Sequence, residues 1–517
     1  MIKSHAAQIF RNALLLATAS LLMRTVGVSF QVYVSNRAGA EAMGLYSLLS
    51  GVYGFALTLA TSGIHLGVTR LTVEAVGKDR PAHVPAVLRR ATVYALFFGC
   101  LASILLFSTA DVIGNHWLHD TRTIPSLRLL SITLPLISLS SAWGGYFTAV
   151  RRPYKNAAVQ VCEQALKIGG TMYFLSALPL GDVEQTCCAL VLGGVGAEVA
   201  SFLLEFLLFR SDRKRHFPTD VRGKGGAVGK KLLGITLPIA LTTYIRSGLV
   251  TLQHILIPAG LRSSGTSHAA ALVAYGSIHS MAMPVILYPA ALISAFSGLL
   301  VPELAEAEAK DSRRHITYMI SRVWSLALLF SIGVAGILIC FSAEIGEALY
   351  PATDAGKYIR ILAPLVPIMY VDTATDAMMK GLGEQVYSMK INIADAAISV
   401  LLIWLLIPRY GIDGYIFAIY FSEVFNTVFS ITHLLSISKT PVRLFKWVYK
   451  PLLCIVGATC AVRALLMLTG WRIVNSALSI VLHCLIAVLI YLILLLLSGA
   501  LDREDVCWFR GLFRKGQ

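Results

Sequence analysis

Residues 15–34, LLATASLLMRTVGVSFQVYV, have the length and apolar character of a helix that crosses a membrane, apart from one residue. About 20 apolar residues are enough to cross the hydrocarbon layer as a helix. Arg24 lies near the middle of the stretch, where insertion scales put the cost of a charge at about 3 kcal/mol. The stretch therefore predicts a membrane-spanning helix that has a specific use for a cation.

The rest of the chain repeats this apolar pattern. Of its 517 residues, 56% are hydrophobic and only 14% are charged, and the mean hydropathy is +0.71. A soluble chain would carry about 25% charged residues. The apolar runs predict fourteen spans, centred near residues 23, 55, 100, 137, 167, 197, 245, 284, 328, 369, 397, 424, 460 and 487. We therefore expect an all-α polytopic membrane protein with fourteen transmembrane helices.

Loop charges predict the orientation, because lysine and arginine accumulate in cytoplasmic loops. With the N-terminus inside, 31 of the 44 lysines and arginines lie on the inner side. Six lie on the outer side: Arg37, Arg122, Arg262, Lys357, Arg409 and Arg472. The bias predicts that both termini are cytoplasmic. It also accounts for the net charge of +16, so no nucleic-acid partner is expected.

An internal repeat divides the chain. LLMRTVGVSFQ (21–31) resembles TTYIRSGLVTLQ (242–253), which matches Arg24 with Arg246 and Gln31 with Gln253. Two later stretches match Glu163 with Asp395, and Glu198 with Glu423. Because the repeat unit holds six spans, an even number, both copies should enter from the same side and form parallel lobes with a site between them.

The repeat predicts five segments. They are an N-terminal lobe (1–210, spans 1–6), a cytoplasmic linker (211–230), a C-terminal lobe (231–438, spans 7–12), two further helices (439–500) and a cytoplasmic tail (501–517).

The matched arginines are the first candidates for substrate binding. An arginine is always charged and presents a planar fork that suits phosphate, so Arg24 and Arg246 could hold a pyrophosphate. Alternatively, each neutralises an intramembrane acid such as Glu163 or Glu198 and serves packing alone. Gln31 and Gln253 accompany them, and Arg70 either reaches a cytoplasmic entrance or marks the inner end of its span.

Acidic residues in the spans are candidates for ion coupling or for charge balance. Asp372 and Asp376 are four residues apart, on one helix face, just after Pro364 and Pro367. The other candidates are Glu163, Glu198, Asp395 and Glu423, and Glu205 is a further acid within a span. Na+ or H+ coupling would use them, whereas the membrane potential alone could also drive an anion outward.

Signatures of enzymes are missing from the sequence. There is no phosphate-binding loop, no nucleophile elbow and no His/Glu metal pattern, so neither an enzyme nor a metal site nor a bound cofactor is expected.

Three stretches carry a resemblance to a known family. GAEAMGLYSL (39–48), TLATSGIHLGVTRLTVE (58–74) and GLLVPELAEA (298–307) resemble stage V sporulation protein B and related polysaccharide-biosynthesis membrane proteins. These belong to the multidrug/oligosaccharidyl-lipid/polysaccharide (MOP) exporter superfamily, which includes MurJ-type lipid II flippases. Arg24 and Gly27 match the R-x-x-G pattern of that branch. Phe30 and Gln31 stand where such flippases often continue with a second arginine and an aspartate.

The resemblance implies two six-helix lobes around a partly cationic cavity, with a lipid-tail groove at residues 449–500. It also implies a location in a bacterial plasma membrane. There the protein would move a polyprenyl-pyrophosphate-linked oligosaccharide or peptidoglycan precursor from the inner to the outer leaflet by alternating access. Partners would be this lipid-linked glycan, membrane lipids and cell-wall synthesis proteins. Alternatives are a drug/cation antiporter of the same superfamily, a non-transporting scaffold of cell-wall or spore-envelope synthesis, and a membrane glycosyltransferase.

Overall fold

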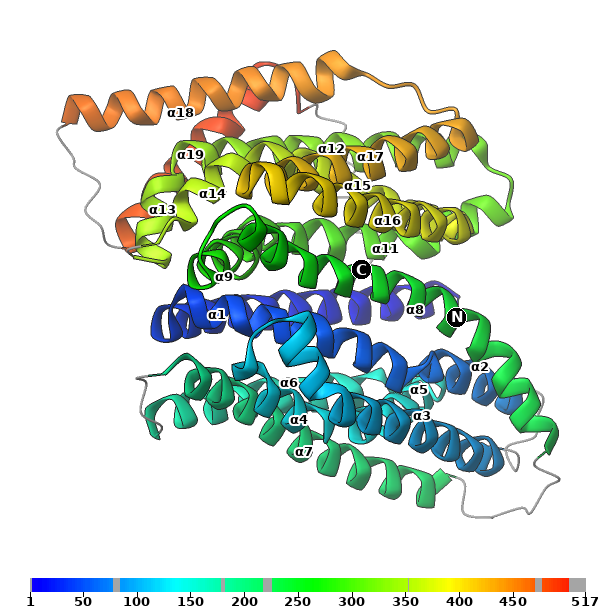
Figure 1. Cartoon of the computed structure of the whole chain (residues 1–517). Helices are drawn as coiled ribbons and strands as arrows, with labels where there is room; N and C mark the ends of the chain where they lie inside the picture. Colours follow the sequence, from blue (N-terminus) through cyan, green and yellow to red (C-terminus); the bar gives the residue numbers. More distant parts are fainter. Residues whose placement is uncertain are drawn as a thin grey trace. The chain divides into compact units, whose positions relative to one another are not determined.

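The computed structural model describes residues 2–77, 84–177, 182–216, 226–351, 353–469 and 477–501, and within them every regular element is a helix. The predicted tail (501–517) lies almost wholly outside the described residues, and so does part of the predicted linker (211–230). Figure 1 shows the helices in chain order. They cluster into two compact units, residues 37–273 and residues 1–36 with 274–517. We call these the first unit and the second unit.

The first half of the chain contains most of the longest helices and a few short elements between them. They are α1 (Ile2–Thr61), α2 (Ile64–Gly77), α3 (Val84–Val112), the π-helix η2 (Ile113–Trp117), the 3-10 helix η3 (Thr121–Thr123), α4 (Ile124–Ser131), α5 (Leu134–Ala149), α6 (Pro153–Ala177), α7 (Val183–His216) and α8 (Gly226–Ser263).

The second half contains more short elements. They are α9 (His268–Gly276), the π-helix η4 (Ser277–Ala282), α10 (Met283–Leu287), α11 (Ala290–Ala309), α12 (Arg313–Cys340), α13 (Ser342–Leu349), α14 (Ala355–Leu362), the 3-10 helix η5 (Ala363–Leu365), α15 (Val366–Gly381), α16 (Gln385–Tyr410), α17 (Ile412–Ser438), the π-helix η6 (Phe445–Tyr449), α18 (Lys450–Thr469) and α19 (Ala477–Leu497).

The first helix, α1, belongs to both units. Gly39 interrupts it with φ 80° and ψ 164°, a conformation open essentially to glycine alone. Residues up to Asn36 group with the second unit, and residues from Arg37 group with the first. Beyond the break, a methyl group on Gly44 would lie 2.2 Å from the carbonyl oxygen of Leu272, so only glycine lets α1 lie this close to α9. The two predicted spans near residues 23 and 55 are therefore one interrupted helix.

The units differ from the predicted lobes. Residues 1–36 group with the second half of the chain, and residues 231–273, which include most of α8, group with the first half. Within the first unit, the Thr251 hydroxyl donates to the carbonyl oxygen of Gly51 at 2.9 Å, which ties α8 to α1. The lobes, which were inferred from the repeat, stay a prediction.

The structure contains eleven helices apolar and long enough to cross a membrane among the described residues, or twelve if the pair α4 and α5, bent by 43°, is one span. The count of fourteen is therefore not confirmed. Helix α6 is not among the candidates and carries Glu163 and Lys167, and α15 has only 16 residues. The predicted span near 284 is instead a pair of candidates, 268–287 and 290–309.

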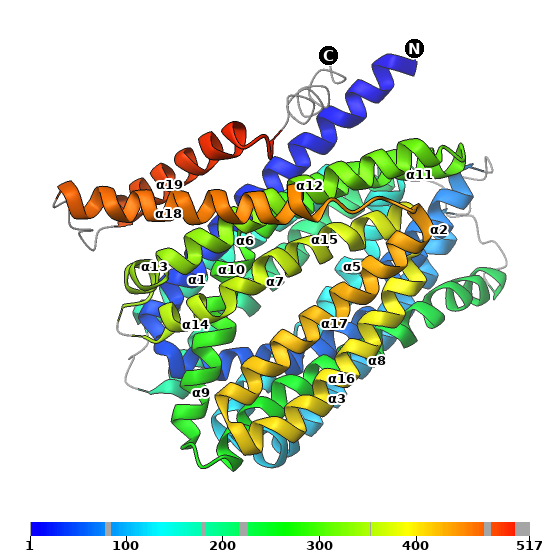
Figure 2. The same ribbon diagram turned by 90° about the horizontal axis from the view of Figure 1, so that it is seen from above.

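Large apolar side chains cover the outside of these helices, as a lipid environment requires. On α18, Met467 and Leu468 are more than 80% exposed. Aromatic stacking fills the core of the first unit, where the ring of Trp143 lies 5.2 Å from that of Phe209. In the second unit α18 packs along α12, as Figure 2 shows from above. The arrangement supports a multi-pass membrane protein.

Candidate functional site

Arg24, in α1, lies at a break between two helices of the second unit. Its Nη2 donates a hydrogen bond of 2.8 Å to the carbonyl oxygen of Leu287, the last residue of α10. In a continuous helix this oxygen would accept from the amide of residue 291, but Ala291 donates to Tyr288 instead. The guanidinium thus donates to a carbonyl that the break deprives of its helical hydrogen-bond donor. The contact uses one of its five N–H donors, and the side chain is exposed.

Neighbouring side chains hold the same break. The Tyr370 hydroxyl donates to the carbonyl oxygen of Ile286 at 2.7 Å, and the hydroxyls of Thr25 and Tyr288 lie 2.9 Å apart. Seven residues after Arg24 on α1, the Gln31 amide donates to the carbonyl oxygen of Ser280, in the π-helix η4, at 2.8 Å. The first part of α1 is therefore fastened to an irregular, polar backbone by the two side chains that the sequence singled out.

Arg246, in α8, has a different environment in the first unit. Its side chain is exposed and forms no hydrogen bond or ion pair with any residue that the structure describes. Beside it, the hydroxyl of Ser247 lies 3.1 Å from that of Thr58, which joins α8 to α1. Gln253 is half-buried and engaged in a contact of its own, and Arg70 is exposed on α2. Because Arg24 and Arg246 belong to different units, their joint action stays a prediction.

Two candidate acids of the first unit lie together. Glu163 on α6 and Glu198 on α7 lie close enough to interact electrostatically, and Lys167 interacts with both. Neither forms an ion pair with Arg246 among the described residues. Glu205, also on α7, is buried. In this unit, the alternative that the arginine neutralises one of these acids is therefore not observed.

The four candidate acids of the second unit form a polar cluster on α15, α16 and α17. Ser388 donates to Asp376 at 2.6 Å, and Ser422 donates to Asp395 at 2.7 Å. Asp372 interacts electrostatically with both aspartates and with Glu423. One oxygen of Asp372, Oδ1, is buried and has no partner among the described residues. Asp395 and Glu423 are the acids that the repeat matched, and Asp372 and Asp376 are the pair chosen from their spacing; their role in coupling stays a prediction.

Within the described ranges, no three His, Cys, Asp or Glu side chains lie close enough to hold a metal ion.

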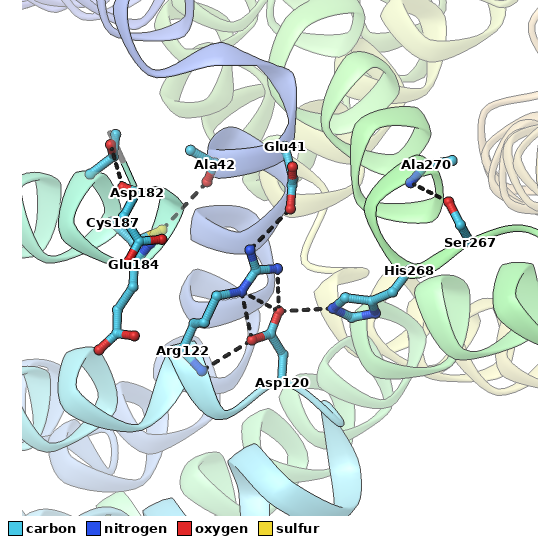
Figure 3. A network of polar contacts seen from close by, with 11 residues as sticks. Glu41, Ala42, Asp120, Arg122, Asp182, Glu184, Cys187, Ser267, His268 and Ala270 are labelled. Atoms are coloured by element: carbon cyan, nitrogen blue, oxygen red, sulfur yellow. Dashed lines mark hydrogen bonds and ion pairs between the residues drawn. The ribbon is translucent and has the colours of Figure 1, made fainter. Parts of the chain in front are cut away.

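A charged network that the sequence did not single out ties three segments of the first unit together (Figure 3). Arg122 donates to Asp120 at 2.8 Å and to Glu41 at 3.0 Å. His268, at the start of α9, lies 2.8 Å from Asp120. Burial alone would raise the pKa of the Asp120 carboxyl, but the hydrogen bonds of Arg122 and His268 outweigh it and lower the pKa. The sequence did offer one signal for this network. Asp120 and Arg122 stand two residues apart on the expected outer side, where the chain has few arginines and lysines.

A second network lies at the other end of that unit. Asp212 on α7 is buried and accepts hydrogen bonds from Arg152 and Lys155, which precede or begin α6. The Tyr146 hydroxyl of α5 donates to it at 2.9 Å. These residues were predicted only as inner-loop charges. Their contacts fix the ends of α5, α6 and α7 to one another.

Comparisons with known proteins identify relatives of the chain. Residues 9–253 match the family described as polysaccharide biosynthesis protein. Stage V sporulation protein B of Bacillus subtilis (strain 168) is 24% identical over 436 residues, which cover 83% of each chain.

Two solved structures share the fold. A lipid II flippase MurJ in an inward closed conformation matches 95% of this chain and 100% of its own, with a TM-score of 0.69 and 16% identity. An inward-facing multidrug resistance MATE family transporter of the MOP superfamily matches 82% of this chain and all of its own, with a TM-score of 0.64 and 15% identity. The resemblance stated from the sequence is confirmed.

Proposed function

We propose that this chain, a membrane transporter of the MOP superfamily related to stage V sporulation protein B and MurJ, is a flippase for a lipid-linked glycan. Its substrate would be a polyprenyl-pyrophosphate-linked oligosaccharide or a peptidoglycan precursor. The head group would move from the inner to the outer leaflet of a bacterial plasma membrane by alternating access. Both termini would be cytoplasmic, and the polyprenyl tail would stay in lipid.

The two repeat-matched arginines supply the observation that supports this proposal most. Both lie in helices apolar enough to cross a membrane, and both side chains are exposed. Neither forms an ion pair with an acid among the described residues of its own unit. A cation within a membrane-spanning helix that has no carboxylate partner favours an anionic ligand, and a guanidinium suits phosphate oxygens. Gln31, Gln253 and Arg70 would add polar contacts.

Rescue of a strain depleted of its own lipid II flippase tests the proposal. Wild type is compared with Arg24→Ala and Arg246→Ala at matched membrane levels, and exposure of lipid II on the outer face is measured. We expect rescue by wild type and failure of both variants. Arg128→Gln is the control, because this arginine forms an exposed ion pair with Asp111, and such pairs contribute about 0–1 kcal/mol.

Each other outcome has a definite meaning. Rescue by all three proteins would keep a flippase and reject the role of the arginines. A well-expressed wild type that fails to rescue would reject lipid II as the substrate, and transport of other lipid-linked glycans would then be assayed in vesicles.

The polar cluster of the second unit favours a second candidate, a drug/cation antiporter. Asp372, Asp376, Asp395 and Glu423 lie together on three helices, and the MATE transporter shares the fold. The same acids could couple a flippase to Na+ or H+, although an inside-negative potential already favours outward movement of an anion by about 2.3 kcal/mol per charge per 100 mV. Asp395→Asn separates the two: drug efflux should be lost for an antiporter, whereas a potential-driven flippase should keep moving lipid-linked glycan.

A further inference from the structure

A cavity of about 940 Å³ lies within the second unit, between α12, the end of α17 and the segment that leads into α18. Six of the residues that line it are basic, and the described lining contains no carboxylate. The six basic residues are Arg313, Arg314, Arg322, Lys439, Arg443 and Lys446. None of the residues that line the cavity is among those assigned to the proposed function.

Helix α12 presents two polar rows to this cavity. Arg314, Tyr318 and Arg322 are four residues apart, and Thr317, Ser321 and Ser325 form the adjacent row. Residues with this spacing lie on one face of a helix. Ser325 is buried, and its hydroxyl has no partner among the described residues. From Arg313 to Ser325 the helix rises about 18 Å, so the cavity extends from the charged end of α12 to a buried, unpaired donor.

The opposite wall is held in place by direct contacts. The Thr317 hydroxyl donates to the carbonyl oxygen of Ser438 at 3.0 Å. The ring of Trp447 lies edge-on to that of Trp324, with centroids 6.5 Å apart. Figure 2 shows the segment between α17 and α18 running beside α12. These contacts hold the two walls of the cavity together, and a preformed site lowers the cost of binding a ligand.

No acid accompanies the basic residues in the described lining of the cavity. Arg313 contacts Asp311 at 3.2 Å and Glu308 at 3.8 Å, and Arg322 lies over the ring of Tyr318 at 5.1 Å. Like charges gathered around one cavity repel one another, and a bound anion relieves that repulsion. Topogenic charges alone would explain basic residues in loops, but not their convergence with a buried hydroxyl on a cavity.

The chemistry of the lining indicates phosphate. Arginine forks bind phosphate oxygens in pairs, and hydroxyls donate further hydrogen bonds. Volumes of roughly 300–1,000 Å³ hold drug-sized ligands, so this cavity has room for more than one phosphate group. Pro441 and Trp447 add apolar surface for the adjoining part of a lipid. Loop charges predict that this end faces the cytoplasm, and basic pockets between helices there bind anionic head groups.

We infer that this basic cavity binds the head group of a membrane lipid that carries two phosphate groups. Two lipids share that chemistry: a diphosphatidyl lipid of the bilayer, and a polyprenyl diphosphate such as the proposed carrier. The inference concerns binding at this cavity and stands whether or not the chain transports the lipid.

Native mass spectrometry of the purified full-length chain tests the inference. Cardiolipin, undecaprenyl diphosphate and phosphatidylglycerol, which has one phosphate, are added separately. We expect at least one diphosphate lipid to bind at least tenfold more tightly than phosphatidylglycerol. The triple variant Arg314→Gln, Lys439→Gln, Arg443→Gln should lose at least tenfold of that affinity. Lys380→Gln with Lys390→Gln, exposed lysines of the same unit that do not line the cavity, should stay within twofold of wild type.

The lipid that binds identifies the source. Binding of cardiolipin alone would make the cavity a site for a bilayer lipid, and binding of undecaprenyl diphosphate alone would make it a site for the carrier. Undiminished affinity of the triple variant, or equal affinity for phosphatidylglycerol, would overturn the inference. Arg314→Lys with Arg443→Lys should keep most of the affinity, which separates lost charge from misfolding. Flippase rescue is scored separately, so either proposal can fail alone.

Discussion

Arg24 and Arg246 occupy the same place in the repeat, yet their surroundings differ. Arg24 donates to the carbonyl oxygen of Leu287 at a helix break, whereas Arg246 is exposed on the continuous helix α8, without a hydrogen bond or ion pair among the described residues. Arginines at equivalent positions of the repeat therefore differ in how much they contribute to the structure. Arg24 combines a structural contact with any role toward a ligand, and a ligand role for Arg246 can be tested almost without a structural cost.

The largest effect that follows from this comparison is a loss of transport in the variant Arg246→Ala. Loss of a charge-assisted contact of about 2 kcal/mol lowers transport about thirtyfold. The thermal unfolding midpoint should hardly change, because a surface substitution without contacts usually shifts stability by less than about 0.5 kcal/mol. Transport in vesicles and Tm are measured on the same preparation. If Arg246→Ala transports normally and keeps the wild-type Tm, Arg246 does not bind the ligand.

The helix break that follows the arginine-bearing part of α1 gives the next effect. Gly39→Ala places a side chain at φ 80° and ψ 164°, which costs about 1–3 kcal/mol although the space around it is open. The matched control is Gly54→Ala, in the helical part of α1 after the break, where a methyl group also meets nothing within 4 Å. Guanidinium unfolding of both variants is compared, and equal stability would show that the break is not needed.

Arg24 itself should show a smaller effect on stability than Gly39 and a larger one than Arg246. Arg24→Ala removes the hydrogen bond of a charged donor to the Leu287 carbonyl, which contributes about 1.5 kcal/mol. Arg24→Lys keeps a charge and a donor, so it should recover most of the stability and part of the transport. An Arg24→Ala variant as stable as wild type would remove the distinction between the two arginines.

A third arginine gives the smallest effect and sharpens the contrast, because Arg122 is paired with acids. The pKa of Asp120 is lowered in the folded state, so its stabilisation is present above the unfolded pKa of about 3.9 and is lost as pH falls through the lower folded value. Between pH 7 and pH 3, wild type should lose about 1 kcal/mol more stability than Asp120→Asn. Identical pH profiles would contradict the proposed contribution of this network.

The sequence alone determined the class of the protein and its relatives. Hydropathy and charge act within one segment, so they indicated membrane helices without knowledge of any contact, and three short stretches of sequence carried the family resemblance. Internal repetition matched Asp395 with Glu163 and Glu423 with Glu198, which singled out four acids within apolar spans. These features could be predicted because each depends on residue type and spacing along the chain.

Only the tertiary structure decided which segments hold one another. The ion pair of Arg122 with Glu41 joins residues 81 positions apart, and the Arg24 contact with Leu287 joins residues 263 apart. Nor did the sequence reveal that α1 breaks at Gly39 and is shared between two units, or that six cations converge on one cavity. Such contacts depend on packing between helices far apart in the chain, and local hydropathy and charge carry no record of that packing.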